Sequence, residues 1–260
     1  MTAAGSTAAR RVAALGRAEL TLLARNRTAL ATALLLPLGM VAAWSPSLAK
    51  LEPGDARASA GRLAMSGGIG FVLLFVVYYN LVTAYVARRE ERVLKRLRTG
   101  EPTDTEILAG TALPAVAVAL VQCTALVVAG ALLLDLPLPH RPDLLLAGVA
   151  LGIVLLVLLA AGSTVFTRSV ELAQLTTAPL LLVSVVGSGL MIPLASLPQP
   201  LGELCRWLPM TAVMELVRAG WFGGAPAAPL AVLQSLCTGL AWTLSAVFAV
   251  QRWFRWEPRR

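Results

Sequence analysis

Apolar and polar residues follow one another along this chain in long blocks rather than in strict alternation. Six apolar blocks approach or exceed the length of about 20 residues that an α-helix needs to cross a bilayer. The segments between them hold the charged residues and most of the prolines. We therefore predict six membrane-spanning helices, at 28–44, 63–87, 107–134, 144–167, 172–190 and 230–250.

The composition supports an all-α integral membrane protein. Hydrophobic residues make up 57% of the chain and charged residues 14%, against about 25% charged residues in a typical soluble domain. Leu, Val and Ala dominate the blocks, which lack the alternating ten-residue segments of a lipid-facing barrel. Because a backbone in lipid must satisfy its own hydrogen bonds, helices are the structure that we expect.

The charge distribution predicts an orientation. The net charge of +8 would suit nucleic acid, but the basic residues lie at the ends of apolar blocks, as orientation signals do. With the N-terminus inside, most of the 22 Lys and Arg residues fall in the inner segments, chiefly 1–27, 88–104 and 251–260. We expect a multi-pass cell-membrane protein with both termini in the cytoplasm and no nucleic-acid partner.

The N-terminal segment 1–27 contains a predicted amphipathic helix on the membrane surface. Arg10, Arg17 and Arg25 share one face of this helix, and the opposite face is mainly apolar. The alternative is a disordered basic tail. The following block also has features of a signal peptide, but the long patterned region before it favours an uncleaved first span. The transmembrane domain is then 28–250, followed by a basic tail at 251–260.

The connection 191–229 between the fifth and sixth spans is semi-apolar and interrupted by prolines. It is too broken for a straight crossing, so we predict short re-entrant or interfacial helices on the outer side. Glu203 and Arg206, like Glu215 and Arg218, are three residues apart, a spacing that places two side chains on one helix face.

A dense run of charge, 88–98, joins the second and third spans. Its pattern predicts a short helix with an apolar edge, in which Glu91 precedes Lys95 in the order that favours an ion pair. Thr103 and Glu106 match a capping box that would start the third span. One interpretation is a docking loop for a cytoplasmic partner, and the alternative is an orientation signal with a solvated helix.

No constellation of catalytic or metal-binding residues emerges from the sequence. There is no GxxxxGK[ST] loop to hold nucleotide phosphates, His140 is the single histidine, and the three cysteines are widely spaced. We expect no catalytic residue, no metal site and no cofactor in this chain, which is then not an enzyme by itself. Acidic residues are absent from the middle of the spans, which argues against proton-coupled transport.

Several stretches resemble ABC-2 type permeases, the membrane subunits of one class of ATP-binding-cassette exporter. The segment from Glu91 to Leu97 is similar to the family's R-E-x-G-x-L-x-x-L stretch after the second span, with Arg92 where the family often has Gly. The fifth-to-sixth connection resembles the family pattern P…LP…L…LP…R…G, and the basic C-terminal tail resembles actinobacterial members. The likeness extends over nearly the whole chain.

This resemblance implies the partners and a coupling element. Two permease subunits, identical or different, would pair in the bilayer above two copies of a separate ATP-binding subunit that holds the ATP and Mg²⁺. The charged loop would form the coupling helix, with the N-terminal surface helix as the connecting helix beside it. The residues that the resemblance assigns to coupling are Glu90, Glu91, Arg92, Leu94, Lys95, Arg96 and Leu97.

The resemblance also implies a pathway at the dimer interface, lined by the second and fifth spans, for outward movement of a hydrophobic or amphipathic drug, antibiotic, peptide or lipid. The candidate pathway residues are Tyr78, Tyr79, Asn80, Thr83, Ser184 and Ser188. The candidate residues of an extracellular gate are Glu203, Arg206, Glu215 and Arg218. Alternatively, the polar groups in the spans hold helices together, and we read the pair Gly148 and Gly152 as packing.

Two other functions fit the same pattern of spans and loops. The first is a membrane scaffold or sensor that binds a cytoplasmic partner through the charged loop. The second is a secondary transporter. Association with a separate ATPase would distinguish the exporter from both.

Overall fold

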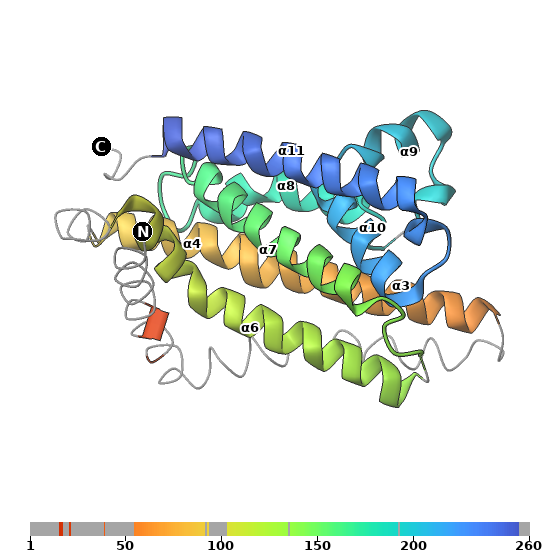
Figure 1. Ribbon diagram of the computed structural model, residues 1–260. Coiled ribbons are helices and arrows are strands. Elements are labelled where there is room, and N and C mark those ends of the chain that lie inside the picture. The colour runs from red at the N-terminus through yellow and green to blue at the C-terminus, as the bar shows by residue number, and fades with distance from the viewer. Residues whose placement is uncertain are drawn as a thin grey trace, which may run out of the picture.

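The computed structural model describes residues 55–91, 93, 103–134, 136–191 and 193–254, together with Gly16, Arg17, Thr21 and Gly39. Throughout these residues the regular secondary structure is helical, and long helices lie side by side while shorter ones gather at one end (Figure 1). The elements are α3 (Asp55–Phe71), the π-helix η1 (Val72–Tyr79), α4 (Asn80–Glu90), α6 (Asp104–Leu133), α7 (Pro142–Ser163), α8 (Ala173–Gly187), η2 (Leu194–Ser196), α9 (Gln199–Arg206), α10 (Pro209–Phe222), η3 (Ala225–Ala227) and α11 (Pro229–Trp253).

Four helical stretches are long and apolar enough to cross a membrane: Ser59–Glu90, Asp104–Leu132, Pro142–Ser163 and Pro229–Trp253. They overlap the second, third, fourth and sixth predicted spans and confirm a long apolar helix at each. The predicted first span lies outside the described residues except for Gly39, which is helical. The surface helix predicted at 10–25 also lies outside them, except for Gly16, Arg17 and Thr21, which are helical.

The predicted fifth span is shorter in the structure than its apolar block. α8 has 15 residues, about 22 Å at 1.5 Å per residue, against a hydrocarbon core of about 30 Å. The helix stops because Gly189 follows its C-cap with a φ of 69°, a left-handed conformation that glycine adopts without strain. Beyond it, η2, α9, α10 and η3 occupy the connection to α11, and the re-entrant or interfacial placement of these helices stays a prediction.

The second span is longer than its apolar block. α3, η1 and α4 follow one another from Asp55 to Glu90, beyond the predicted limits of 63–87 at both ends. Arg88 and Arg89, which we assigned to the charged loop, therefore form the last turn of α4. Basic side chains are favourable there because they complement the negative end of the helix dipole.

α7 and α10 pack closely against one another within the bundle. A Cβ atom built on Gly148 would lie 3.0 Å from the Cβ atom of Leu216, and one built on Gly220 would lie 2.2 Å from the backbone nitrogen of Leu145. Only glycine lets the two helices approach so closely. The packing interpretation of Gly148 is thus confirmed.

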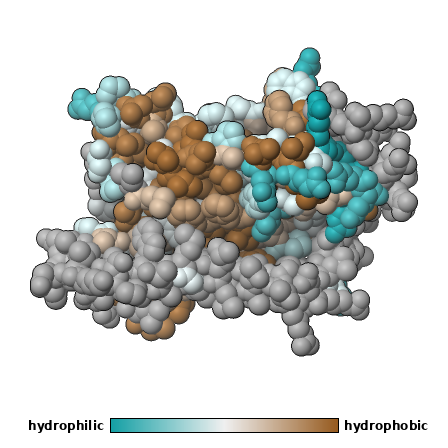
Figure 2. All heavy atoms as spheres, turned by 180° about the vertical axis from the view of Figure 1, so that it is seen from behind, coloured by the Kyte–Doolittle hydropathy of each residue, from teal (hydrophilic) through white to brown (hydrophobic). Residues whose placement is uncertain are grey.

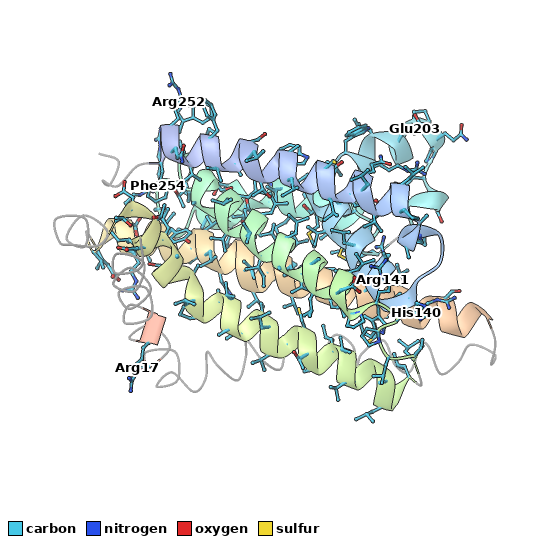
Figure 3. The ribbon with its side chains drawn as sticks, viewed as in Figure 1. Arg17, His140, Arg141, Glu203, Arg252 and Phe254 are labelled. Carbon is cyan, nitrogen blue, oxygen red and sulfur yellow. The ribbon has the colours of Figure 1, made fainter. Side chains whose placement is uncertain are left out.

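The two ends of the bundle differ in what they carry. Arg252 and Phe254 lie at the end where α4 finishes, here called the α4 end, and His140, Arg141 and Glu203 lie at the opposite α9 end (Figure 3). The face seen from behind is apolar over its middle, with hydrophilic residues gathered mainly at the α4 end (Figure 2). This apolar band between polar ends is what a bilayer requires.

Candidate coupling end and transport pathway

The charged loop begins and ends in ordered contacts at the α4 end. Glu90 and Glu91 are exposed, and Val93 is half-buried and helical. At the other edge of the loop, the Thr103 backbone N–H donates to Glu106 Oε2 at 2.8 Å, and the Glu106 N–H donates to Thr103 Oγ1 at 3.4 Å. The predicted capping box is therefore confirmed. The remaining predicted coupling residues, Arg92, Leu94, Lys95, Arg96 and Leu97, lie outside the described residues.

Arg89 is buried although it borders the charged loop. Its side chain is 1% exposed, and its guanidinium donates through Nη1 to the Thr164 carbonyl at 2.9 Å and through Nη2 to the Thr167 carbonyl at 2.5 Å. Thr164 caps α7, so these bonds satisfy carbonyl groups where the helix can no longer do so. The cation also complements the negative end of the α7 dipole.

The same contact region continues into α8. The Thr167 hydroxyl lies 2.8 Å from the Thr176 hydroxyl and also donates to the Ser163 carbonyl at 3.0 Å. Thr176 belongs to the first turn of α8. The end of α4, the end of α7 and the start of α8 are thus joined through polar contacts at the α4 end of the bundle.

The predicted pathway residues divide between the bundle interior and its surface. Tyr78 is fully buried, with its hydroxyl 2.9 Å from Ser163 Oγ. Ser184 and Ser188 are also buried. Tyr78 therefore joins the second span to α7, which is the contact expected of a residue that holds helices together.

The other pathway residues lie on a less covered face of the second span. Asn80 is exposed, and Tyr79 and Thr83 are half-buried. Phe75 is 40% exposed, and its ring centroid lies 6.4 Å from that of Tyr79. Further along, Phe71 stacks on Phe75 with a centroid separation of 5.8 Å. This face combines aromatic rings with an amide and a hydroxyl group.

The four predicted gate residues also separate into two pairs. Arg218 on α10 donates to the Ser188 carbonyl at 3.3 Å and to the Gly189 carbonyl, which holds the end of α8 against α10. Glu215 accepts a hydrogen bond from Ser235 Oγ of α11 at 2.8 Å. Burial lowers the pKa of Arg218 from its ordinary value, and the charge of Glu215 opposes this shift. Glu203 and Arg206 are exposed on α9, and Figure 3 shows Glu203 pointing away from the bundle.

Comparison with known families identifies the class of the protein. The family model described as "ABC-2 type transporter" matches residues 10–222. The chain belongs to the ABC-2 type transporter family. No curated protein matches it significantly.

As a member of this family, the chain is the membrane permease component of an ABC transporter, and the family normally works with an ATP-binding subunit. The permease is a transport component with apolar spanning helices. Among the described residues, no group of three His, Cys, Asp or Glu side chains could hold a metal ion. The interior feature of this permease that sequence reasoning missed is Arg89, which nothing in the sequence distinguishes from Arg88.

Proposed function

We propose that this permease moves a hydrophobic or amphipathic small molecule outward, driven by ATP hydrolysis in a separate subunit. The observation that carries the proposal is the charged loop 88–104, which is anchored at both edges by Arg89 and by the Thr103 capping box. A loop that serves only as an orientation signal needs basic charge but no such anchorage. Anchorage at both edges suits a loop that receives force from a cytoplasmic partner.

The loop is the proposed docking element for the ATPase. Glu90 and Glu91 are exposed at its start, and Arg92, Leu94, Lys95, Arg96 and Leu97 continue it along the sequence. The excess of basic charge and the apolar edge match a short amphipathic helix that binds in a groove. Two ATPase subunits, which bind the ATP and Mg²⁺, would each engage one permease of a pair.

The surface face of the second span is the proposed substrate pathway. Tyr79, Asn80 and Thr83 on this face, with the Phe75 ring beside them, offer stacking surface and a few hydrogen-bonding groups. That mixture suits an amphipathic drug, antibiotic, peptide or lipid. A second permease subunit facing this surface would complete the pathway, whereas Ser184 and Ser188 are buried within the bundle.

The short helices at the α9 end form the proposed outer gate. Arg218 and Glu215 connect α8, α10 and α11 behind it, whereas Glu203 and Arg206 lie at its surface. α9 also exposes Leu201 and Leu204, and its C-cap residue Trp207 is exposed as well. Exposed apolar and Trp side chains on a helix with a charged opposite side are typical of the membrane interface, and this supports the proposal that α9 lies at the outer surface of the bilayer.

Co-purification with the ATPase tests the proposal. Tagged wild-type chain is solubilised from its native membranes, bound ATP-binding subunits are detected by photolabelling with azido-ATP, and vanadate-sensitive hydrolysis is measured. Reversing the charges with Arg92→Glu and Arg96→Glu should reduce ATPase recovery while membrane insertion is retained. Arg141→Glu is the matched control, because Arg141 is exposed at the α9 end.

The result separates the candidate functions. An ATP-binding subunit recovered with the wild type and with Arg141→Glu, but not with the double variant, supports the exporter and its docking loop. Recovery of the wild type alone, without hydrolysis, contradicts the exporter. Transport that depends on a proton gradient and not on nucleotide would then identify a secondary transporter.

A further inference from the structure

We infer that Arg89 is a positioning residue that carries movement of the charged loop to α7 and α8. Arg89 ends the second span, and its side chain adds hydrogen bonds to the end of α7 beyond the packing of α4 against α7 and α8. This inference rests on the proposed function, because it assumes that the loop receives force from the ATPase. It adds a specific residue and a specific route.

The position of Arg89 supports this role. It is followed directly by the exposed Glu90 and Glu91 of the loop, yet its own side chain is 1% exposed. Its guanidinium reaches two carbonyl groups on the same segment, those of Thr164 and Thr167. Because a guanidinium is planar and rigid, two such bonds fix both the position and the angle of the contact.

The segment that Arg89 holds is well placed to pass movement on. α7 packs against α10, α11, η1 and α4, so a shift of its end reaches α10 within the outer connection and α11 after it. Thr167 itself bonds to Thr176 in the first turn of α8. Movement of Arg89 can therefore pass through its hydrogen bonds to the end of α7, and from there to α8 and α10. The second span does not need to bend for this.

The chain offers a matched control for the loss of a buried bond from α4. The Tyr85 hydroxyl, also buried, donates to the Leu108 carbonyl of α6 at 3.0 Å. Tyr85→Phe removes a hydrogen bond between α4 and a neighbouring helix but leaves the contact with α7 intact. It should lower thermal stability without an effect on coupling.

The test compares Arg89→Lys, Arg89→Met and Tyr85→Phe in the complex with the co-purified ATPase. Hydrogen–deuterium exchange is measured with and without ATP and vanadate, which traps the ATPase after hydrolysis. In the wild type and in Tyr85→Phe, trapping should change exchange in the segments 164–172 and 209–222. In the complex that each Arg89 variant forms with the ATPase, this distant exchange response should be lost while the response at 88–104 remains.

Other outcomes overturn the inference in identifiable ways. A wild-type exchange response in either Arg89 variant shows that the movement travels by another route. If both Arg89 variants lose the ATPase while Tyr85→Phe keeps it, Arg89 shapes the docking loop itself and is not the link to α7. An ATPase absent from the wild-type complex would instead refute the proposed function, so the two failures are distinguishable.

Discussion

The crossing of α10 with α7 makes a quantitative prediction for Gly220→Ala. A Cβ atom at residue 220 would lie 2.2 Å from the Leu145 backbone nitrogen, 2.7 Å from the Leu145 Cα atom and 2.9 Å from the Arg141 carbonyl oxygen. All three neighbours are backbone atoms, so no side chain can rotate away. The Arg141 N–H also donates to the Gly220 carbonyl at 2.8 Å in this crossing, and separating the helices weakens that bond.

The expected loss of stability combines three contributions. Overpacking a close contact costs about 1–3 kcal/mol, and loss of a hydrogen bond costs about 1 kcal/mol. Alanine returns about 0.5–1 kcal/mol relative to glycine within a helix. We therefore expect Gly220→Ala to lower the free energy of unfolding by roughly 1–3.5 kcal/mol.

Two glycines of α7, Gly148 and Gly162, calibrate the experiment on Gly220 of α10. At Gly148 the built Cβ atom lies 3.0 Å from the Leu216 Cβ atom and from the Val217 nitrogen, whereas at Gly162 no atom lies within 4 Å. Thermal unfolding of the solubilised variants should rank Gly162→Ala at or above the wild type, then Gly148→Ala, then Gly220→Ala. A Gly220→Ala protein that unfolds at the wild-type temperature would refute the close crossing.

Two further predictions concern the α9 end and the pathway. Arg218→Met should free the end of α8 and lower the melting temperature, because hydrogen bonds to a charged group contribute about 1.5–3 kcal/mol. Arg206→Met, at an exposed site on α9, should change the melting temperature little. Equal effects of the two variants would contradict the contact of Arg218 with α8. Tyr78→Phe should lower the free energy of unfolding by about 1 kcal/mol. Asn80→Ala should leave the free energy of unfolding unchanged but alter which hydrophobic compounds stimulate the ATPase. An unchanged stimulation profile would argue against Asn80 as a pathway residue.

The sequence predicted the features that depend on local patterns. Apolar blocks near twenty residues located four spans, and the capping box at Thr103 marked the start of α6 within a few residues. The spacing of Gly148 and Gly152 indicated close helix packing before any partner helix was known. Each of these signals is complete within one short segment of the chain.

Features that depend on a distant segment could not be predicted in the same way. Arg88 and Arg89 are equivalent in sequence, and only the position of the α7 end makes Arg89 the buried one. The apolar block at 172–190 does not reveal that α8 ends at Gly187, since that depends on the backbone of Gly189 and on Arg218 from α10. Residues two apart do not share a helix face, but which of Tyr78 and Asn80 is buried depends on how η1 packs against α6 and α7.

Site-specific photo-crosslinking tests the central claim most directly. A photoreactive amino acid replaces Glu91, the exposed C-cap residue of α4, or Glu203, which is exposed on α9 at the opposite end of the bundle. The complex is then irradiated in native membranes. The account predicts a covalent product between the ATP-binding subunit and the chain carrying the probe at residue 91, and none with the probe at residue 203. A product from residue 203, or none from residue 91 while the ATPase still co-purifies, would contradict docking through the charged loop.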